Sequence, residues 1–516
     1  MNQFFNDLKE GITSVFKGSA KQENLFGLNG RPPLAKAIPF GLQHVLAMFV
    51  ANITPLLIVF GAIGIVNTPI ATQAILGSLF MAGVGTVIQL LIGARLPIVI
   101  GTSFTFVGVF ITIGLSAGGG IEGYYTILGS VLVGGLIASF LCLFIRWWGK
   151  LIKPIVPCVV VFAIGLSLVQ SGATQFLGGA GTLGSLAGGE TSSVPYYCYL
   201  IVAFITLLSA ILWQIFAKGV WKNLNIIFGI AVGYIVCLCI PGMIDFSALK
   251  VENVQDVITY PHFANVSQFR FKLVPIVLTT VCFLMAVVEG IGDTNALCAG
   301  GLGRRPTNRE ITGVLVFDGF NSFLCSFFGT LPLTTFSQNV GIVAQTKVIN
   351  RFTIFIGAVF LVVASCFPVV ANFLLTIPDC VLGGTMVILF GSIAVVGMKM
   401  CGEVGFSDKN VLILSLSICL GFGLTLVSDF FAFLQSSGLQ AVSDLFSNNV
   451  LNMFLVAFIL SWALPDDMNF TWRKKVSTPA QEYGSQSENI TTEPTADSEV
   501  ADNGDVTDCS TDVGEK

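Results

Sequence analysis

The stretch from Thr334 to Lys347, TTFSQNVGIVAQTK, is a polar, glycine-containing interruption within a long run of apolar sequence. Hydrocarbon cannot hydrogen-bond to backbone N–H and C=O groups, so such an interruption at membrane depth must lie against protein or a water-lined cavity. A similar stretch occurs earlier: TSFTFVG, residues 102–108, aligns with TTFSQNVG, residues 334–341, when one residue is inserted in the second. Two interruptions, one in each half of the chain, predict a transporter built from two repeats with its site between them.

The composition predicts an all-α polytopic membrane protein. Of the 516 residues, 54% are apolar and only 10% are charged, which is far outside the usual range of soluble proteins. Apolar runs of about 20 residues, the length that crosses about 30 Å of hydrocarbon, predict fourteen transmembrane segments between Leu42 and Trp462. The third and tenth of these segments contain the two interruptions and are expected to be short and broken.

The placement of Lys and Arg tests this count, because cytoplasmic loops are enriched in positive charge. With fourteen segments, 22 of the 25 Lys and Arg residues fall on the side of the membrane that holds the N-terminus. The other three, Lys250, Arg270 and Lys272, lie in one loop between segments seven and eight. Both termini are therefore expected in the cytoplasm, and the protein is expected in the cell membrane.

The two ends of the chain differ from its apolar middle. The first 30 residues lack a cleavable signal pattern. A modest amphipathic helix on the membrane surface is one expectation for this segment, and a loosely ordered start is the other; the apolar face would comprise Phe4, Phe5, Leu8, Ile12, Val15 and Phe16. From Ser477 to Lys516 the chain is rich in Ser, Thr, Glu and Asp, and this composition predicts a disordered tail.

The cysteines do not predict a metal site. All 13 are scattered through the chain without the spacing of metal ligands, and most fall within apolar segments. Such residues are typical of small apolar packing positions. No metal, cofactor or nucleic-acid partner is expected.

Segments five and twelve also resemble each other. Segment five begins with KPIVPC, residues 153–158, and segment twelve begins after IPDC, residues 377–380. The offset is seven segments, as it is between segments three and ten. Because seven is odd, the second repeat must be inverted in the membrane relative to the first.

Glu289 and Asp293 in segment eight are the strongest candidates for chemistry. They are four residues apart, so they share one face of a helix, and Glu289 lies more than four turns from the start of the segment at Leu273. No Lys or Arg lies inside an expected segment to neutralise them. Intramembrane ionisable residues usually mark a functional site. Because low polarity penalises the ionised carboxylate, one of the pair can hold a proton near neutral pH, as a proton-coupled carrier requires.

Two further ionisable residues lie in the expected segments. Asp318 stands alone in segment nine, where it either takes part in coupling or hydrogen-bonds to a neighbouring segment. His44 follows Gln43 at the start of segment one. It is either one member of an interfacial polar pair or a residue near the site.

The interruptions also contain groups that suit a planar heterocycle. Gln338 presents a carbonyl and an NH₂ together, so it can make a two-point hydrogen bond to the edge of an amide-like ring. Phe104 and Phe336 offer flat apolar faces for stacking, although most of the 44 phenylalanines must face lipid or the core. Gly341 would allow close backbone approach, and a half-helix starting near it would point free N–H groups into a cavity.

These motifs resemble the nucleobase-ascorbate transporter family, the nucleobase:cation symporters. The resemblance rests first on QNVG, residues 338–341, followed by Thr346 and Lys347. This matches the family signature of Gln or Glu, Asn, any residue, Gly, four variable residues, Thr, and then Arg, Lys or Gly. Further matches are Gln43-His44, Gly101-Thr102-Ser103-Phe104, and Glu289 with Asp293, so the resemblance extends from about Pro33 to Pro465.

The resemblance implies roles for individual residues. Glu289, Gln338, Phe104 and Ser337 are expected to bind the base. Phe336, Asn339 and Gly341 are the motif residues expected beside them, and cation or proton coupling is expected to involve Glu289, Asp293, Asp318 and His44.

It also implies an architecture of seven plus seven inverted segments, with a core domain that moves against a gate domain in a homodimer. The expected divisions are an N-terminal segment at 1–40, core parts at 41–150 and 273–376, gate parts at 151–245 and 377–465, an extracellular loop at 246–272 and a disordered cytoplasmic tail at 466–516.

The signature also indicates a branch of the family. Gln at position 338 is similar to the xanthine and uric acid permeases and unlike the uracil permeases. Val340 departs from the commoner purine pattern, which often has Asn there, and Lys347 also occurs in ascorbate-type members. The expected function is therefore import of xanthine or uric acid with a cation, H⁺ rather than Na⁺, with uracil and ascorbate as alternatives.

Two rival functions match parts of the sequence. GIGD, residues 290–293, matches the GxGD motif of intramembrane aspartyl proteases, but the second Asp and the Pro-Ala-Leu sequence of that class are missing. The protein is therefore not expected to be an enzyme. An anion carrier of the same fold, such as a sulfate transporter, would be expected to show a basic residue or a bare pair of helix N-termini. The acidic Glu289 argues against it.

Overall fold

A computed structural model describes residues 2–16, 25–66, 68–188, 194–244, 246, 258–439, 442–443 and 446–465. The predicted tail, residues 466–516, lies outside the described residues, as do residues 247–257 of the expected loop at 246–272.

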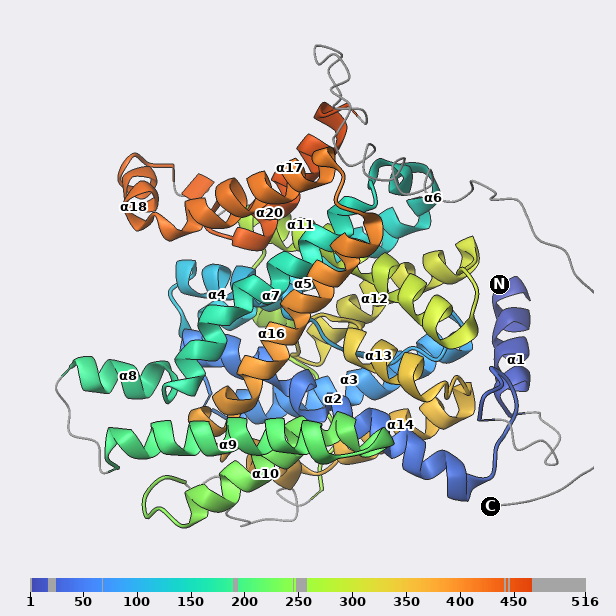
Figure 1. The fold of residues 1–516 in the computed structure, drawn as a ribbon, viewed down its shortest axis with the longest axis horizontal. Coiled ribbons are helices and arrows are strands. Elements are labelled where there is room, and N and C mark those ends of the chain that lie inside the picture. Colours follow the sequence, from blue (N-terminus) through green and yellow to red (C-terminus); the bar gives the residue numbers. More distant parts are fainter. Residues whose placement is uncertain are drawn as a thin grey trace, which may run out of the picture. The chain divides into compact units, whose positions relative to one another are not determined.

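The described residues form helices and two short strands (Figure 1). The first half contains α1 (Asn2–Phe16), α2 (Leu34–Ile63), α3 (Pro69–Leu91), β1 (Ile100–Thr102), η1 (Phe104–Phe106), α4 (Val107–Ser116), α5 (Gly120–Leu143), α6 (Ile145–Trp148), η2 (Gly149–Leu151), α7 (Ile155–Phe176), α8 (Gly179–Ala187), α9 (Tyr196–Phe216), η3 (Gly219–Leu224) and α10 (Asn225–Leu238). The second half contains η6 (Val266–Gln268), α11 (Leu273–Leu297), η7 (Cys298–Leu302), α12 (Asn308–Phe327), β2 (Leu333–Thr335), α13 (Ser337–Thr346), α14 (Arg351–Ala364), α15 (Pro368–Leu375), α16 (Asp379–Val404), α17 (Asp408–Leu416), η8 (Ser417–Phe422), η9 (Gly423–Leu426), α18 (Ser428–Ser436) and α20 (Asn449–Ala463).

The chain is a multi-pass integral membrane protein. Among the described residues, eight helical spans are long and apolar enough to cross a membrane: α2, α3, α5, α7, α9, α11 with η7, α16, and α17 with η8 and η9. A ninth is formed by α14 and α15 if these two helices, bent by 83°, are counted as one span. Shorter apolar helices are α4 with η1, α10 and α20.

Several helices begin at the residues that local sequence rules favour. Before α12, the Thr307 hydroxyl accepts a hydrogen bond from the Glu310 N–H, and the Glu310 carboxylate accepts one from the Thr307 N–H. This reciprocal pair is a capping box. The side chains of Asn350 and Asn448 cap α14 and α20 in the same position before the first turn.

Both predicted interruptions are confirmed as breaks in helical structure. Each consists of a three-residue strand followed by a short helix, β1 leading through η1 into α4 and β2 leading into α13. The two strands pair antiparallel, with Gly101 opposite Thr334 at the centre of the register. Beyond the strands, the Ser103 N–H donates to the Pro332 carbonyl at 3.0 Å.

Side chains of neighbouring helices accept hydrogen bonds from strand N–H groups that the pairing leaves free. Asn52 on α2 accepts from the Thr102 N–H at 2.8 Å, and Thr86 on α3 accepts from the Ile100 N–H at 3.1 Å. Ser322 on α12 accepts from the Leu333 N–H at 3.2 Å. These bonds replace the water that extended backbone would otherwise need.

The helices pack in two groups. One group comprises α2, α3, α5, α11, α12 and α14, and the other comprises α7, α9, α10, α16 and α20. The closest packing in the second group joins α7 to α16, which lie side by side in the middle of Figure 1. A Cβ added to Gly165 would overlap Ala394, and one added to Gly397 would overlap Phe162. Small residues thus let the two backbones approach closely, as is common between helices in membranes.

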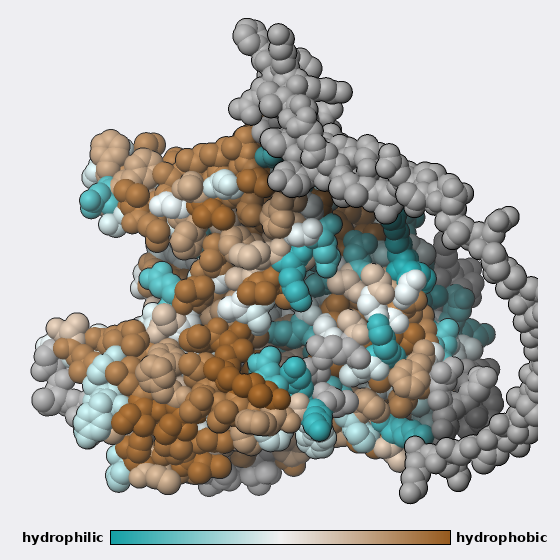
Figure 2. Space-filling view, viewed as in Figure 1, coloured by the Kyte–Doolittle hydropathy of each residue, from teal (hydrophilic) through white to brown (hydrophobic). Residues whose placement is uncertain are grey.

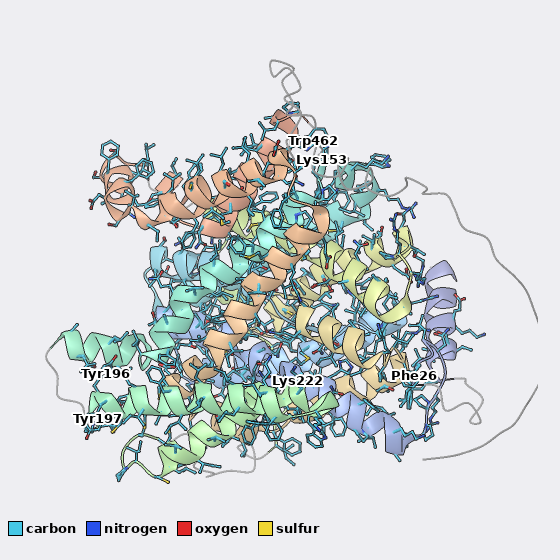
Figure 3. The ribbon with its side chains drawn as sticks, in the orientation of Figure 1. Phe26, Lys153, Tyr196, Tyr197, Lys222 and Trp462 are labelled. Carbon is cyan, nitrogen blue, oxygen red and sulfur yellow. The ribbon has the colours of Figure 1, made fainter. Side chains whose placement is uncertain are left out.

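The end of α20 is fixed to the start of α7. The Lys153 ammonium lies 4.6 Å from the centre of the Trp462 ring, and Figure 3 shows the two side chains together. The Trp462 indole N–H also donates to the Leu151 carbonyl at 2.7 Å. Figure 3 places Tyr196 and Tyr197 at the far end of α9, so aromatic residues occupy helix ends as they do at membrane interfaces.

The N-terminal helix α1 packs against protein instead of lying free on a membrane surface. Val15 is completely buried with Ala37 and Phe352. The Phe16 ring lies 5.0 Å from that of Phe355. Earlier in α1, the Glu10 carboxylate forms an ion pair with the Arg95 guanidinium at 3.0 Å. A helix was one of the two expectations for this segment, and its docking on α3 and α14 was not expected.

A buried arginine reinforces this docking. Arg351, at the start of α14, is only 3% exposed. Its guanidinium donates to the Ser14 hydroxyl at 2.7 Å, to the side-chain oxygen of Asn29, and to the Leu90 carbonyl at 3.3 Å. The N-terminal segment therefore supplies two of the acceptors that offset burial of this charge.

Gly11→Val is expected to detach α1 from α3. A Cβ at Gly11 would overlap the carbonyl oxygen of Leu91, which belongs to the backbone and cannot turn aside. We expect a lower midpoint of thermal unfolding in detergent and faster proteolysis within residues 2–16. Ile12→Ala, on the exposed side of the same helix, is the matched control. Equal stability and equal proteolysis in Gly11→Val and wild type would contradict the docking.

Candidate functional site

The two carboxylates of α11 lie beside the two interruptions. The Glu289 carboxylate accepts a hydrogen bond from the Thr105 hydroxyl at 2.8 Å, and Thr105 belongs to η1 before α4. The Asp293 carboxylate accepts one from the Ser337 hydroxyl at 2.7 Å, and Ser337 is the first residue of α13. Each short helix thus offers one hydroxyl to one carboxylate of the same helical face.

A cavity of about 800 Å³ adjoins these groups. In Figure 2, hydrophilic residues gather around a hollow in the region of α16 and α13, between apolar surfaces. Seven of the ten predicted site residues line this cavity: Phe104, Glu289, Asp293, Phe336, Ser337, Gln338 and Gly341. Its volume is within the usual range for small-molecule sites.

Gln338 has a free hydrogen-bonding group at the cavity. Its side-chain carbonyl oxygen is buried and has no hydrogen-bond partner among the described residues. An unpartnered buried acceptor costs free energy unless a ligand or water supplies a donor. Gln338 thus lines the cavity with an unpartnered acceptor, and its role in ligand binding stays a prediction.

The two predicted phenylalanines differ in their surroundings. Phe104 is half-buried, and its ring meets that of Phe390 on α16 edge-on, with the centres 5.5 Å apart. Phe336 is only 5% exposed and packs against β1, where a Cβ on Gly101 would lie 2.8 Å from its ring. Phe104 therefore has the more accessible face for stacking.

The position of Gly341 corrects one expectation. The short helix begins at Ser337, so Gly341 lies in its second turn and not at its start. A Cβ added there would meet no atom within 4 Å. Gly341 therefore contributes open space in the cavity wall. The N–H groups of Asn339 and Val340 both donate to the Phe336 carbonyl, at 3.1 and 3.3 Å, which leaves only Ser337 and Gln338 without a backbone acceptor among the described residues.

The other three predicted residues lie behind the cavity wall. Asp318 accepts hydrogen bonds from the Gln89 side chain at 2.8 Å and from the Thr335 N–H at 3.1 Å, so it joins α12 to α3 and to β2. The Asn339 side chain donates to the His44 carbonyl at 3.4 Å. The imidazole Nδ1 of His44 has no partner among the described residues, and the ring is 2% exposed.

Two groups at the site were missed in the sequence, one behind the cavity wall and one in it. Thr105, the partner of Glu289, follows the aligned Phe104 and carried no separate signal. Lys399 lines the cavity from α16. Helix α16 continues to Val404, beyond the apolar run that predicted segment twelve, and therefore includes Lys399. Within the described ranges, no three His, Cys, Asp or Glu side chains are grouped as metal ligands.

The fold is that of a multi-pass membrane protein with a cavity beside two interruptions in its helices. The sequence profile described as "Permease family" matches residues 35–430. The chain therefore belongs to this permease family, the nucleobase-ascorbate transporter family that its motifs resemble.

Named relatives include xanthine permeases. The chain is 32% identical over 466 residues to the xanthine permease XanQ of Escherichia coli, covering 86% of this chain and 95% of that protein. It is also 32% identical over 444 residues to the xanthine permease of Bacillus subtilis, covering 84% and 94%. These relatives are named as transporters, not as enzymes.

A solved structure shares the fold at low identity. The transmembrane domain of the cyanobacterial bicarbonate transporter BicA aligns with a TM-score of 0.54 and 17% identity, covering 84% of this chain and 98% of that one. Similarity at this level indicates a common fold.

Asp318→Leu is expected to destabilise the protein. It would leave the Thr335 N–H and the Gln89 NH₂ buried without this acceptor, at a cost of about 1–3 kcal/mol for each group left unsatisfied. The midpoint of thermal unfolding in detergent should fall. Asp318→Asn, which retains one carbonyl oxygen, should lose less. An unchanged midpoint in Asp318→Leu would show that these hydrogen bonds do not support the strands.

Proposed function

We propose that the protein is a secondary transporter that imports a purine nucleobase, xanthine or uric acid, together with a proton. The observation that carries the proposal is the position of Gln338 and Glu289 on one cavity, with an unpartnered amide carbonyl on the first. A planar ring with N–H and C=O groups along its edge can bond to both. The names of the xanthine permease relatives support this substrate class.

Proton coupling is assigned to the carboxylates of α11. Glu289 and Asp293 share one helical face and each accepts one hydroxyl hydrogen bond. Two carboxylates this close disfavour simultaneous ionisation, and no basic side chain is paired with either among the described residues. Asp318 and His44 are proposed to act from behind the cavity wall. Asp318 would act through the strands, and His44 through Asn339.

The proposed architecture has fourteen membrane segments in two inverted repeats. In this proposal, five further helices bring the eight long spans and the bent pair to fourteen: α4, α10, α12, α13 and α20. Corresponding strand-to-helix breaks, antiparallel pairing of β1 with β2, and close packing of α7 with α16 support the inversion. We further propose a cell-membrane homodimer with both termini in the cytoplasm.

The proposed mechanism is an elevator in which the group containing α2, α3, α11, α12 and α14 moves against the group containing α7 and α16. The ligand site lies where the two groups face each other, since α11 and α13 form one wall of the cavity and α7 and α16 another. Movement of one group would then expose the same site to each side in turn. Uracil, ascorbate and an inorganic anion remain the alternative substrates.

Uptake of radiolabelled xanthine, urate and uracil tests the proposal. We expect uptake of xanthine or urate, little uptake of uracil, and loss of purine uptake when a protonophore collapses the proton gradient. The assay uses cells that lack their own permeases, with empty vector as the control. Purine uptake that resists the protonophore but requires Na⁺ would overturn proton coupling, and uptake of uracil alone would overturn the purine assignment.

Glu289→Gln and Gln338→Ala are expected to lower purine uptake at least tenfold without removing the protein from the membrane, because each deletes a group that faces the ligand. Glu122→Gln and Gln170→Ala, at exposed positions outside the cavity, are the matched controls. Wild-type rates in either site variant at equal surface expression would remove that residue from the site.

A further inference from the structure

The cavity has a closed end and an open end. At the closed end, Phe390 on α16 is 1% exposed and its ring meets Phe104. The cavity lining continues along α16 from Ser392 to Val404 and along α7 from Ile164 back to Pro154. At the end where α16 finishes and α7 begins, Lys399 and Glu403 are exposed. The cavity therefore opens at the C-terminal end of α16.

This open end is the positively charged side of the protein. Gly149 and Ile152 line it, and they belong to the link that also carries Arg146, Lys150 and Lys153. The positive-inside rule assigns such a side to the cytoplasm. The conformation thus connects the site to the cytoplasmic end of the cavity.

Lys399 differs in charge from every other ionisable group of the cavity wall. The lining residues contain three carboxylates, Glu289, Asp293 and Glu403, and one basic side chain, Lys399. Lys399 makes no hydrogen bond or ion pair with any described residue. Glu403 is one turn further along the same helix, but the two groups are not paired. The ammonium is therefore free to meet a solute that passes through the open end.

The charge of the ligand is the property that this lysine can recognise. Xanthine and uric acid lose a ring proton near or below neutral pH and become monoanions. The carboxylates deeper in the cavity repel an anion, whereas a lysine at the mouth attracts it, because a cleft with low-dielectric walls strengthens the field of its charges. A lysine acts as a mobile, hydrated point charge and needs no fixed partner geometry.

We propose that Lys399 is a specificity residue that binds the monoanionic form of the purine at the open end of the cavity. The inference rests on the proposed function and adds to it the charge state of the ligand. Lys399 binds the anion at the mouth, a position separate from the proposed ring site at Gln338 and Glu289 deeper in the cavity.

Equilibrium binding of radiolabelled xanthine to the purified full-length protein tests the inference. Binding is measured at a pH well below and a pH well above the first pKa of xanthine, in wild type, Lys399→Gln and Lys399→Arg. We expect Lys399→Gln to weaken binding about three- to tenfold at the higher pH and to change it less than about twofold at the lower pH, as suits one partly solvated charge. Lys399→Arg should keep wild-type binding at both.

Other ionisable groups line the same cavity, so the ratio of binding in the variant to binding in wild type is the measured quantity. The groups that face the lysine across the cavity are Glu403 on its own helix, Glu289 and Asp293 on α11, and Cys158 on α7. They are the same in both proteins. Glu403→Gln removes a charge of the opposite sign from the same face and should not weaken binding at the higher pH. High salt should reduce the effect of Lys399→Gln.

Chemical modification of a cysteine variant separates the effect of charge on binding from any effect on folding. Lys399→Cys can be treated in its folded state with a positively or a negatively charged methanethiosulfonate reagent, with treated wild type as the control for the native cysteines. The positive adduct should restore xanthine binding at the higher pH, and the negative adduct should not. Restoration by both adducts would overturn a role for charge.

The outcomes separate failure of the proposed function from failure of the inference on Lys399. Wild-type protein that binds neither xanthine nor urate at either pH would overturn the proposed function and this inference with it. A second outcome is that wild-type protein binds xanthine, and Lys399→Gln binds it as well as wild type or more weakly by the same factor at both pH values. This outcome would overturn this inference alone.

Discussion

The structure depends on the rule that backbone N–H and C=O groups within a membrane must find partners in the protein. Two non-helical stretches, at β1 and β2, meet this rule by pairing with each other. Their outer groups bond to side chains such as Asn52, Thr86 and Ser322 on the surrounding helices. Because each stretch supplies the partners of the other, neither could exist at this depth alone. Because β1 and β2 pair with each other, the first turns of α4 and α13 face α11. The cavity lies at this place.

Polar residues in this protein therefore fall into two sets with different roles. One set, including Asn52, Ser322 and Asp318, is fully engaged in holding the strands and is buried. The other set, including Gln338 and Lys399, faces the cavity and retains unused hydrogen-bonding capacity. Substitutions in the first set act on stability, since they leave backbone groups unsatisfied. Substitutions in the second set act on the ligand.

Much of this arrangement was predictable from the sequence. The polar stretch Thr334–Lys347 and its earlier counterpart indicated the two breaks, and the four-residue spacing of Glu289 and Asp293 placed them on one face. The alignment did not indicate that Thr105 and Ser337 would bond to those carboxylates, because a hydroxyl is compatible with many positions. Lys399 was missed because the end of an apolar run is a poor guide to the end of a helix, and α16 continues past it. His44 and Asn339 have polar side chains that suit a site equally well, and only tertiary packing placed them behind the wall.

The docking of α1 has a practical consequence. Gly11, Val15 and the bonds to Arg351 fix this helix to α3 and α14, which belong to the group that carries the strands. A fluorophore attached at α1 would therefore keep a constant distance to that group. A second fluorophore at the end of α20, which is fixed to the start of α7 through Trp462 and Lys153, would belong to the other group. Energy transfer between the two labels would follow displacement of one group against the other, with no label inside the membrane.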